Sequence, residues 1–225
     1  MKKMIINDGF KPELVRNAKF DSIFEIPCFK NTNCLSIPDE LIPFSQRSRS
    51  MAKVEFVHFY EHDIHFNDFI NNPEKYIDEL SRFSGVISPD CSLYRDMPLC
   101  LQITNIYLNH ALGVYMQTNG INVIPNIRWG DERTYTPLFT EIPIAFIGVP
   151  KNSIVSIGTY GCIQGKENKF HFKNGLKNML KYLSPRVVVV YGAMPSVVFE
   201  EFRNSTQFIH FEDYISSKKG FAHHG

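Results

Sequence analysis

RVVVVYG (residues 186–192) is the stretch that decides the fold. Its four consecutive valines show no polar alternation, so a strand formed from them buries both of its faces. Strands of this kind are typical of a parallel sheet that is covered by helices. The stretch therefore predicts an α/β protein.

Strand and helix candidates alternate around this stretch. Apolar runs that predict strands occupy 54–60, 85–88, 121–127, 153–158 and 207–213. Helical spacing predicts helices over 67–83, 98–120, 174–183 and 196–202. We expect a mainly parallel sheet flanked by helices, and the sequence leaves open whether it forms an open three-layer sheet or an incomplete barrel.

The chain divides into three parts by composition. Residues 1–53 contain several prolines and the segment SQRSRS (45–50), which predicts an irregular N-terminal arm packed on the core. Residues 54–215 carry the alternating pattern and form the predicted α/β domain. Residues 216–225 include two lysines and two histidines and are predicted to be a mobile tail.

Composition excludes several classes of protein. The chain has 225 residues, 44% of them hydrophobic, which is ordinary for a globular domain. A formal net charge of +1 provides no general attraction for nucleic acid or for an anionic membrane. No secretory signal and no membrane-spanning apolar run is evident, and five cysteines do not suggest a disulfide framework. We therefore expect no membrane partner and an intracellular location.

Polar and aromatic residues follow the predicted strands. They are Asp63 after 54–60; Asp90, Ser92, Tyr94 and Arg95 after 85–88; Arg128, Trp129 and Asp131 after 121–127; Tyr160 and Gly161 after 153–158; and Tyr191 and Gly192 after 186–190. Because the carboxyl ends of parallel strands meet at one edge, these residues are expected to gather there. Ligands of α/β sheets and barrels bind at that edge, so the pattern predicts a binding site.

Each group of candidates has a chemical role. Asp90 and Asp131 are the candidate catalytic residues, as a general base or as metal ligands. Arg95 and Arg128 would hold an anionic group, and the tyrosines would position or stack against the ligand.

Several of these residues also have a purely structural interpretation. Asp90 could cap the segment that follows it, and Arg128 could pair internally with Asp90 or Asp63. Trp129 is better explained as a core residue than as a stacking platform. Gly161 and Gly192 could serve only turns that require a positive φ.

A metal site is left open by the sequence. His58 and His62 are four residues apart, which suits a helix and not a strand, and no HExxH or HxxEH motif occurs. Asp63, Asp90 and Asp131 could together hold Mg²⁺ with an anionic substrate.

Familiar motifs of other enzyme classes are missing. The sequence contains no GxxxxGK[ST], no GxGxxG after a strand, no GxSxG and no CxxC. These absences argue against P-loop, dinucleotide-binding, serine-hydrolase and thioredoxin-like proteins. No helix-turn-helix or basic stripe gives a strong nucleic-acid signal.

The most specific pieces of the chain are SPD-x-S (88–92), RWGD (128–131), TYG (159–161) and the Tyr-Gly pair at 191–192. On these pieces, residues 54–195 resemble the domain of unknown function 4417 family of bacteria, phages and mobile elements. The resemblance implies an α/β domain in a phage or mobile-element setting, and hence the cytoplasm of a bacterial or phage-infected cell. It implies no activity.

Three hypotheses for function follow from the residues. The first is the binding or processing of a phosphorylated small molecule, such as a nucleotide, at the carboxyl ends of the strands. The second is a binding module without chemistry that captures a nucleotide or a host protein. The third is an assembly component in which the polar residues form only an internal salt-bridge network.

Overall fold

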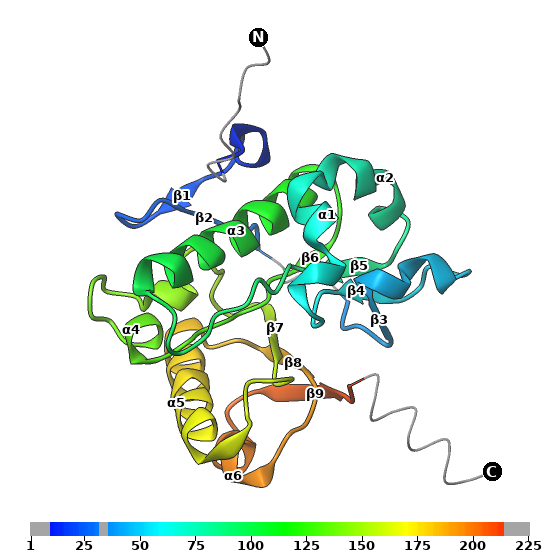
Figure 1. Cartoon of the computed structure of the whole chain (residues 1–225). Coiled ribbons are helices and arrows are strands. Elements are labelled where there is room, and N and C mark those ends of the chain that lie inside the picture. Colours follow the sequence, from blue (N-terminus) through cyan, green and yellow to red (C-terminus); the bar gives the residue numbers. More distant parts are fainter. Residues whose placement is uncertain (1–9, 32–35, 214–225) are drawn as a thin grey trace, which may run out of the picture.

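The computed structural model describes residues 10–31 and 36–213 and contains two parallel sheets (Figure 1). The first sheet has the order β3 (Leu41–Pro43), β4 (Phe56–His58), β5 (Gly85–Ile87), β6 (Val123–Ile124). The second has the order β7 (Ile154–Gly158), β8 (Val187–Tyr191), β9 (Gln207–Phe211). The α/β fold and the mainly parallel sheet are thus confirmed.

The two sheets are joined into one curved surface. A parallel bridge between Asn126 and Ser156 connects the end of β6 to β7. The nitrogen of Ile127 donates to the carbonyl of Ser156 at 2.8 Å. Every strand from β3 to β9 then lies beside its neighbour in sequence. In a doubly wound sheet the strand order reverses direction at one point, and this sheet has no such reversal. The structure therefore favours the incomplete barrel over the open three-layer sheet.

The interior of the barrel is a cluster of side chains from both sheets. Phe56, Ile87, Ile124, Val187 and Val189 pack together there, although their strands belong to different sheets. Aromatic rings also meet across the interior. His58 on β4 lies 4.3 Å from the ring of Tyr191 on β8, measured between ring centroids. Inward residues of β4 therefore contact inward residues of a strand four places away in the order.

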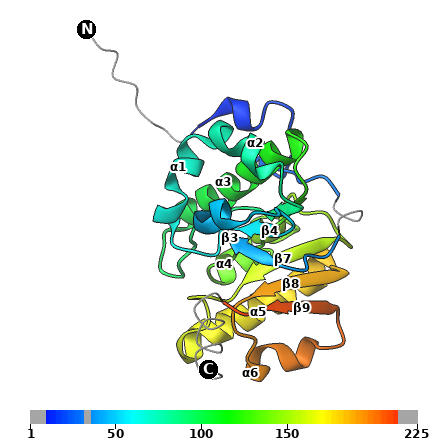
Figure 2. The same ribbon diagram turned by 90° about the vertical axis from the view of Figure 1, so that its right-hand side faces the viewer.

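Helices cover the outer face of the barrel. They are α1 (Asn67–Asn71), α2 (Ile77–Leu80), α3 (Leu99–Thr118), α4 (Glu132–Tyr135), α5 (Gly165–Leu183) and α6 (Ser196–Phe199). Figure 2 shows α1, α2 and α3 on one side of the strands and α5 and α6 on the other. Leu176 and Met179 of α5 pack against Val188 and Val190 of β8.

The prediction that the strand of four valines buries both of its faces is confirmed. Val187 and Val189 face the interior, whereas Val188 and Val190 face the helices. All four are at most 2% exposed. Burial of each side chain contributes about 1.5–3 kcal/mol relative to leaving it in water.

One predicted helix is broken in the structure. The segment 67–83 forms α1, a 3₁₀ turn over Pro73–Tyr76, and α2. Asn72 has an extended φ of −140°, as expected for a residue whose helical conformation clashes with the proline that follows. By contrast, α3 begins after Pro98 and ends before Gly120, as its sequence predicts.

The N-terminal residues pack on the barrel through α3. An antiparallel pair, β1 (Phe20–Asp21) and β2 (Ile26–Pro27), lies against this helix. His110 of α3 contacts the carbonyl of Pro27 at 2.9 Å, and burial lowers the pKa of this histidine to about 4. Strand β3 also lies within the segment predicted as an arm and pairs with β4. The predicted tail, 216–225, lies outside the described residues.

The remaining short elements are 3₁₀ turns. They cover Pro12–Leu14, Phe44–Arg49, Asp63–His65, Ile144–Phe146 and Glu200–Phe202. None of the helices within residues 10–31 and 36–213 has the length and apolar character needed to cross a membrane.

Candidate functional site

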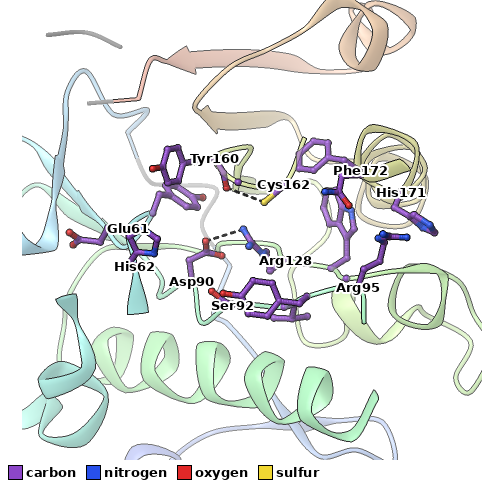
Figure 3. A pocket seen from close by; sticks show the side chains of 17 residues that line it. Glu61, His62, Asp90, Ser92, Arg95, Arg128, Tyr160, Cys162, His171 and Phe172 are labelled. Atoms are coloured by element: carbon purple, nitrogen blue, oxygen red, sulfur yellow. Dashed lines mark hydrogen bonds and ion pairs between the residues drawn. The ribbon is translucent and has the colours of Figure 1, made fainter. Parts of the chain in front are cut away.

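A cavity of about 250 Å³ opens at the carboxyl ends of four neighbouring strands, β4 to β7 (Figure 3). Its lining comes from the segments that follow these strands and from the first turns of α5. The lining residues are Tyr60, Glu61, His62, Asp90, Ser92, Leu93, Tyr94, Arg95, Arg128, Trp129, Gly130, Tyr160, Gly161, Cys162, Asn168, His171 and Phe172. The edge expected to carry the site therefore does carry a cavity.

An ion pair between Asp90 and Arg128 lies in the middle of this cavity. Arg128 Nη1 donates to Asp90 Oδ2 at 3.1 Å, and Asn126 Nδ2 donates to Asp90 Oδ1 at 2.8 Å. Both charged side chains are largely buried, with exposed fractions of 14% for Arg128 and 9% for Asp90. The sequence left open that Arg128 pairs internally with Asp90, and the structure contains this ion pair.

Burial affects the pKa values of both partners. Loss of water raises the pKa of Asp90, although Arg128 and Asn126 act in the opposite direction. Burial opposes the charge on Arg128, but the nearby Asp90 outweighs it and the pKa of the guanidinium is raised. The arginine therefore stays charged, and the aspartate is the member of the pair that can take up a proton.

The described residues accept hydrogen bonds from only some of the donors of the Arg128 guanidinium. Its Nε is buried and has no hydrogen-bond partner among the described residues. A buried donor without a partner costs roughly 1–3 kcal/mol, so such a group is expected to have a ligand or an ordered water. Because Arg128 lines the cavity, an anion bound there can accept hydrogen bonds from it.

A buried hydrogen-bond network supports the pair from below. The hydroxyl of Tyr60 donates to Asn126 Oδ1 at 3.0 Å and lies 2.7 Å from Ser156 Oγ. Burial raises the pKa of Tyr60, so its hydroxyl keeps its proton. The network links β4, β6 and β7 and fixes the amide of Asn126 that holds Asp90.

Aromatic side chains and a second arginine surround the cavity mouth. Tyr94 is 59% exposed and Tyr160 is 45% exposed, which leaves their rings accessible to a ligand. Arg95 is paired with Glu167 at the start of α5. In Figure 3, Arg95 and His171 lie at one end of the pocket, and Glu61 and His62 lie at the other.

Cys162 lies on the same wall as Arg128. Its Sγ contacts the carbonyl of Tyr160 at 3.2 Å. Burial raises the pKa of this thiol, although the charge on Arg128 acts in the opposite direction. The thiol form therefore predominates, and the side chain acts as a small polar wall of the cavity.

Other predicted residues lie at the cavity in supporting positions. Ser92 lines it and is fixed by Asp63, whose Oδ1 accepts from Ser92 Oγ at 3.0 Å. Trp129 contributes to the lining but packs mainly in the core, with its ring 5.1 Å from Phe172. Gly161 has a φ of +74°, which a residue with a side chain rarely adopts.

Four predicted residues lie outside the lining of this cavity, and Asp63, which binds Ser92, is one of them. Tyr191 contacts the neighbouring part of the barrel mouth, and Gly192, with a φ of +97°, turns the chain after β8. Asp131 is the N-cap of α4 and accepts from the backbone nitrogen of Arg133 at 3.0 Å. Burial acts to raise the pKa of Asp131, but the hydrogen bonds from Arg133 outweigh it, so the pKa is lowered.

The acidic trio considered for Mg²⁺ is not assembled. Asp63 binds Ser92, Asp90 binds Arg128 and Asp131 binds Arg133, each in a different direction. Within the part of the chain that the structure describes, no three His, Cys, Asp or Glu residues are grouped as a metal site would require.

The cavity also contains residues that are not among the site residues predicted from the sequence. They are Tyr60, Glu61, His62, Leu93, Gly130, Cys162, Asn168, His171 and Phe172. Tyr60 could have been found, because it ends the same apolar run that precedes Asp63. Asn168, His171 and Phe172 belong to α5, whose first turns precede the predicted helix start at 174. Their position depends on how α5 packs.

Comparisons with known proteins place this chain near phage proteins. The profile of the family described as "Domain of unknown function (DUF4417)" matches residues 18–212. The chain is 29% identical over 176 residues to the "Gene 1 protein" of Mycobacterium phage D29, covering 77% of this chain and 62% of that protein. It is 28% identical over 189 residues to the "Gene 1 protein" of Mycobacterium phage L5, covering 79% of this chain and 80% of that protein. No solved structure matches the chain.

Proposed function

Because this chain belongs to the domain of unknown function (DUF4417) family, we propose its function from its own cavity: it binds a phosphorylated small molecule, such as a nucleotide. The single observation that carries this proposal is the buried guanidinium of Arg128. Asp90 occupies only one of its nitrogens, and its Nε has no partner among the described residues. The proposed setting is the cytoplasm of a bacterial or phage-infected cell.

The surroundings of Arg128 support an anionic ligand with a planar part. A phosphate has several acceptor oxygens and is recognised well by the fixed donors of a guanidinium. Exposed rings of Tyr94 and Tyr160 provide flat surfaces for stacking next to the proposed phosphate position. A cavity lined by a few fixed polar groups and several aromatic rings is typical of small-molecule sites.

Processing of the bound molecule is a second candidate function. The observation that favours it is the position of Asp90, a buried carboxyl with a raised pKa beside the proposed phosphate position. A carboxyl with a raised pKa can act as a general acid or base toward a bound substrate. A binding module without chemistry would need Arg128 but would not need Asp90.

The test compares two variants that differ only in the guanidinium. Asp90→Asn keeps Arg128, whereas the double variant Asp90→Asn/Arg128→Met removes both charges and leaves no lone buried charge behind. We expect inorganic phosphate and adenosine 5′-monophosphate to bind the first variant. Loss of charge-assisted hydrogen bonds worth about 1.5–3 kcal/mol should weaken binding to the second by roughly 10- to 100-fold.

Isothermal titration calorimetry measures both affinities, and thermal unfolding verifies that each variant is folded. A ligand at one hundred times its dissociation constant adds about 2.7 kcal/mol of stability, so binding also raises the midpoint of unfolding. Arg203→Ala is the matched control, because Arg203 is an exposed arginine paired with Glu200. Equal phosphate affinity in the two cavity variants would contradict the proposal. Turnover that stops in folded Asp90→Asn would support processing.

A further inference from the structure

The mouth of the barrel has a second lobe next to the proposed phosphate site. A cavity of about 320 Å³ lies beside the ends of β3, β4, β7, β8 and β9. It shares Tyr60, Glu61, His62 and Tyr160 with the cavity around Arg128. These four side chains therefore lie where the two cavities adjoin.

The two lobes differ in their charged residues. Arg95 and Arg128 line the first lobe together with Asp90, and Glu61 borders both lobes. The described residues of the second lobe include Glu61 and Asp213 but no lysine or arginine. Carboxylates accept hydrogen bonds from hydroxyl and amino groups, whereas arginines donate to phosphate oxygens. The complementary ligand thus has an anionic end and a hydrogen-bond-donating end.

The position of Glu61 is fixed by the chain itself. Its Oε1 accepts from the backbone nitrogen of Ser45 at 2.9 Å. Figure 3 shows Glu61 at the far end of the pocket from Arg95, with Asp90 and Arg128 between them. A carboxylate held in this way is preorganised to accept from a ligand, because little rotational freedom is left to lose.

Tyrosine rings lie at the junction of the two lobes. Tyr160 belongs to both linings and is 45% exposed. Tyr60 and Tyr191, which line the same lobe, stack with ring centroids 5.2 Å apart and an angle of 12° between the rings. An exposed ring at this point offers a stacking surface to a planar group that spans from one lobe to the other.

From these observations we infer that the ligand is a ribonucleoside 5′-monophosphate whose phosphate binds Arg128 and whose ribose hydroxyl groups bind Glu61 in the second lobe, with the base on Tyr160. This inference rests on the proposed function and adds the substrate class. The first lobe alone is smaller than a usual small-molecule site and the second is at the lower end of the range, whereas the two together fall well within it.

The inference is tested with the full chain and three probes: inorganic phosphate, adenosine 5′-monophosphate and its 2′,3′-dideoxy analogue. We expect the nucleotide to bind at least about tenfold more tightly than inorganic phosphate. Glu61→Gln should weaken nucleotide binding about five- to tenfold and leave the affinity for inorganic phosphate unchanged. The dideoxy analogue should bind the wild type and Glu61→Gln equally, because it lacks the groups that Glu61 accepts from.

The controls separate this inference from the proposed function. Glu141→Gln removes an exposed carboxylate that lines neither lobe and should change none of the three affinities. If phosphate binds through Arg128 but the nucleotide binds no more tightly and Glu61→Gln has no effect, the inference is wrong and the proposed function stands. If neither phosphate nor nucleotide binding depends on Arg128, both are wrong.

Discussion

At the scale of the residue, Asp90 is the group whose protonation can respond to a ligand. Its carboxylate lies 3.1 Å from Arg128 Nη1 and is almost fully buried. Burial already raises its pKa, and an anion on Arg128 would bring a second negative charge close to it. Anion binding should therefore raise the pKa of Asp90 further and draw a proton onto it.

This coupling predicts that anion affinity rises as pH falls. Above its raised pKa, Asp90 is ionised and repels the anion, and as pH falls through that pKa the repulsion is lost. Sulfate is a suitable probe because its own charge does not change over the pH range in which a carboxyl of raised pKa titrates. Calorimetric titrations of sulfate across this range should show the slope.

Asp90→Asn should remove the part of the slope that Asp90 causes. At a pH where Asp90 is ionised in the wild type, the variant should bind sulfate more tightly than the wild type, by about tenfold for each pKa unit of coupling. The variant should also be less stable by roughly 3 kcal/mol, because Arg128 loses its buried counter-ion. An unchanged slope in the folded variant would show that the pH dependence of sulfate binding does not come from Asp90.

At the scale of the element, the short helix α4 explains the contacts of Asp131. Asp131 accepts from the backbone nitrogen of Arg133, and its carboxylate also accepts from Arg133 Nε at 2.9 Å. Arg133 Nη2 in turn donates to the carbonyl of Arg95 at 3.1 Å. The cap thus connects α4 to the loop that carries the rim arginine of the cavity.

Asp131→Ala should lower stability without abolishing ligand binding. Loss of an N-cap costs about 0.5–2 kcal/mol. Denaturant unfolding measures this loss, and calorimetry with inorganic phosphate measures binding. Asp131→Asn is the matched variant, because asparagine also caps helices well and should recover most of the stability. A folded Asp131→Ala protein that binds phosphate but has lost turnover would instead restore Asp131 as a catalytic residue.

At the scale of the whole molecule, the barrel depends on close contact between strands that are far apart in the sheet order. Gly158 is the last residue of β7, and a side chain at this position would point toward the ring of Tyr60. A β-carbon built on Gly158 would lie 2.5 Å from Tyr60 Cδ1, which is shorter than any real contact. The absence of a side chain at Gly158 therefore allows the end of β4 to approach β7.

Gly158→Ala should destabilise the protein by about 1–3 kcal/mol through overpacking. It should also weaken phosphate binding, because Tyr60 supports the Asn126 amide that holds Asp90. A double-mutant cycle with Tyr60→Ala tests the cause, since the alanine at 158 should cost much less once the ring is absent. Fully additive losses of stability would show that the two residues do not press on each other.

The sequence by itself determined the element types and the edge that carries the site. Consecutive apolar residues such as 187–190 bury both faces of a strand whatever packs on them, and polar residues after each strand share one edge because parallel strands point the same way. These are local or directional properties. They predicted β4 to β9, and they placed Asp90, Arg95, Arg128 and Tyr160 together at one edge.

Only the tertiary structure decided how the sheet is curved and which of these residues face the cavity. The strand order β3 to β9 and the bridge from Asn126 to Ser156 are contacts between segments distant in sequence, and no periodicity encodes them. The curvature brings Tyr60 onto Tyr191 and turns Asp131 away into a helix cap. Position along a strand is a local property of the chain, whereas the direction of a side chain in a cavity depends on every element packed around it.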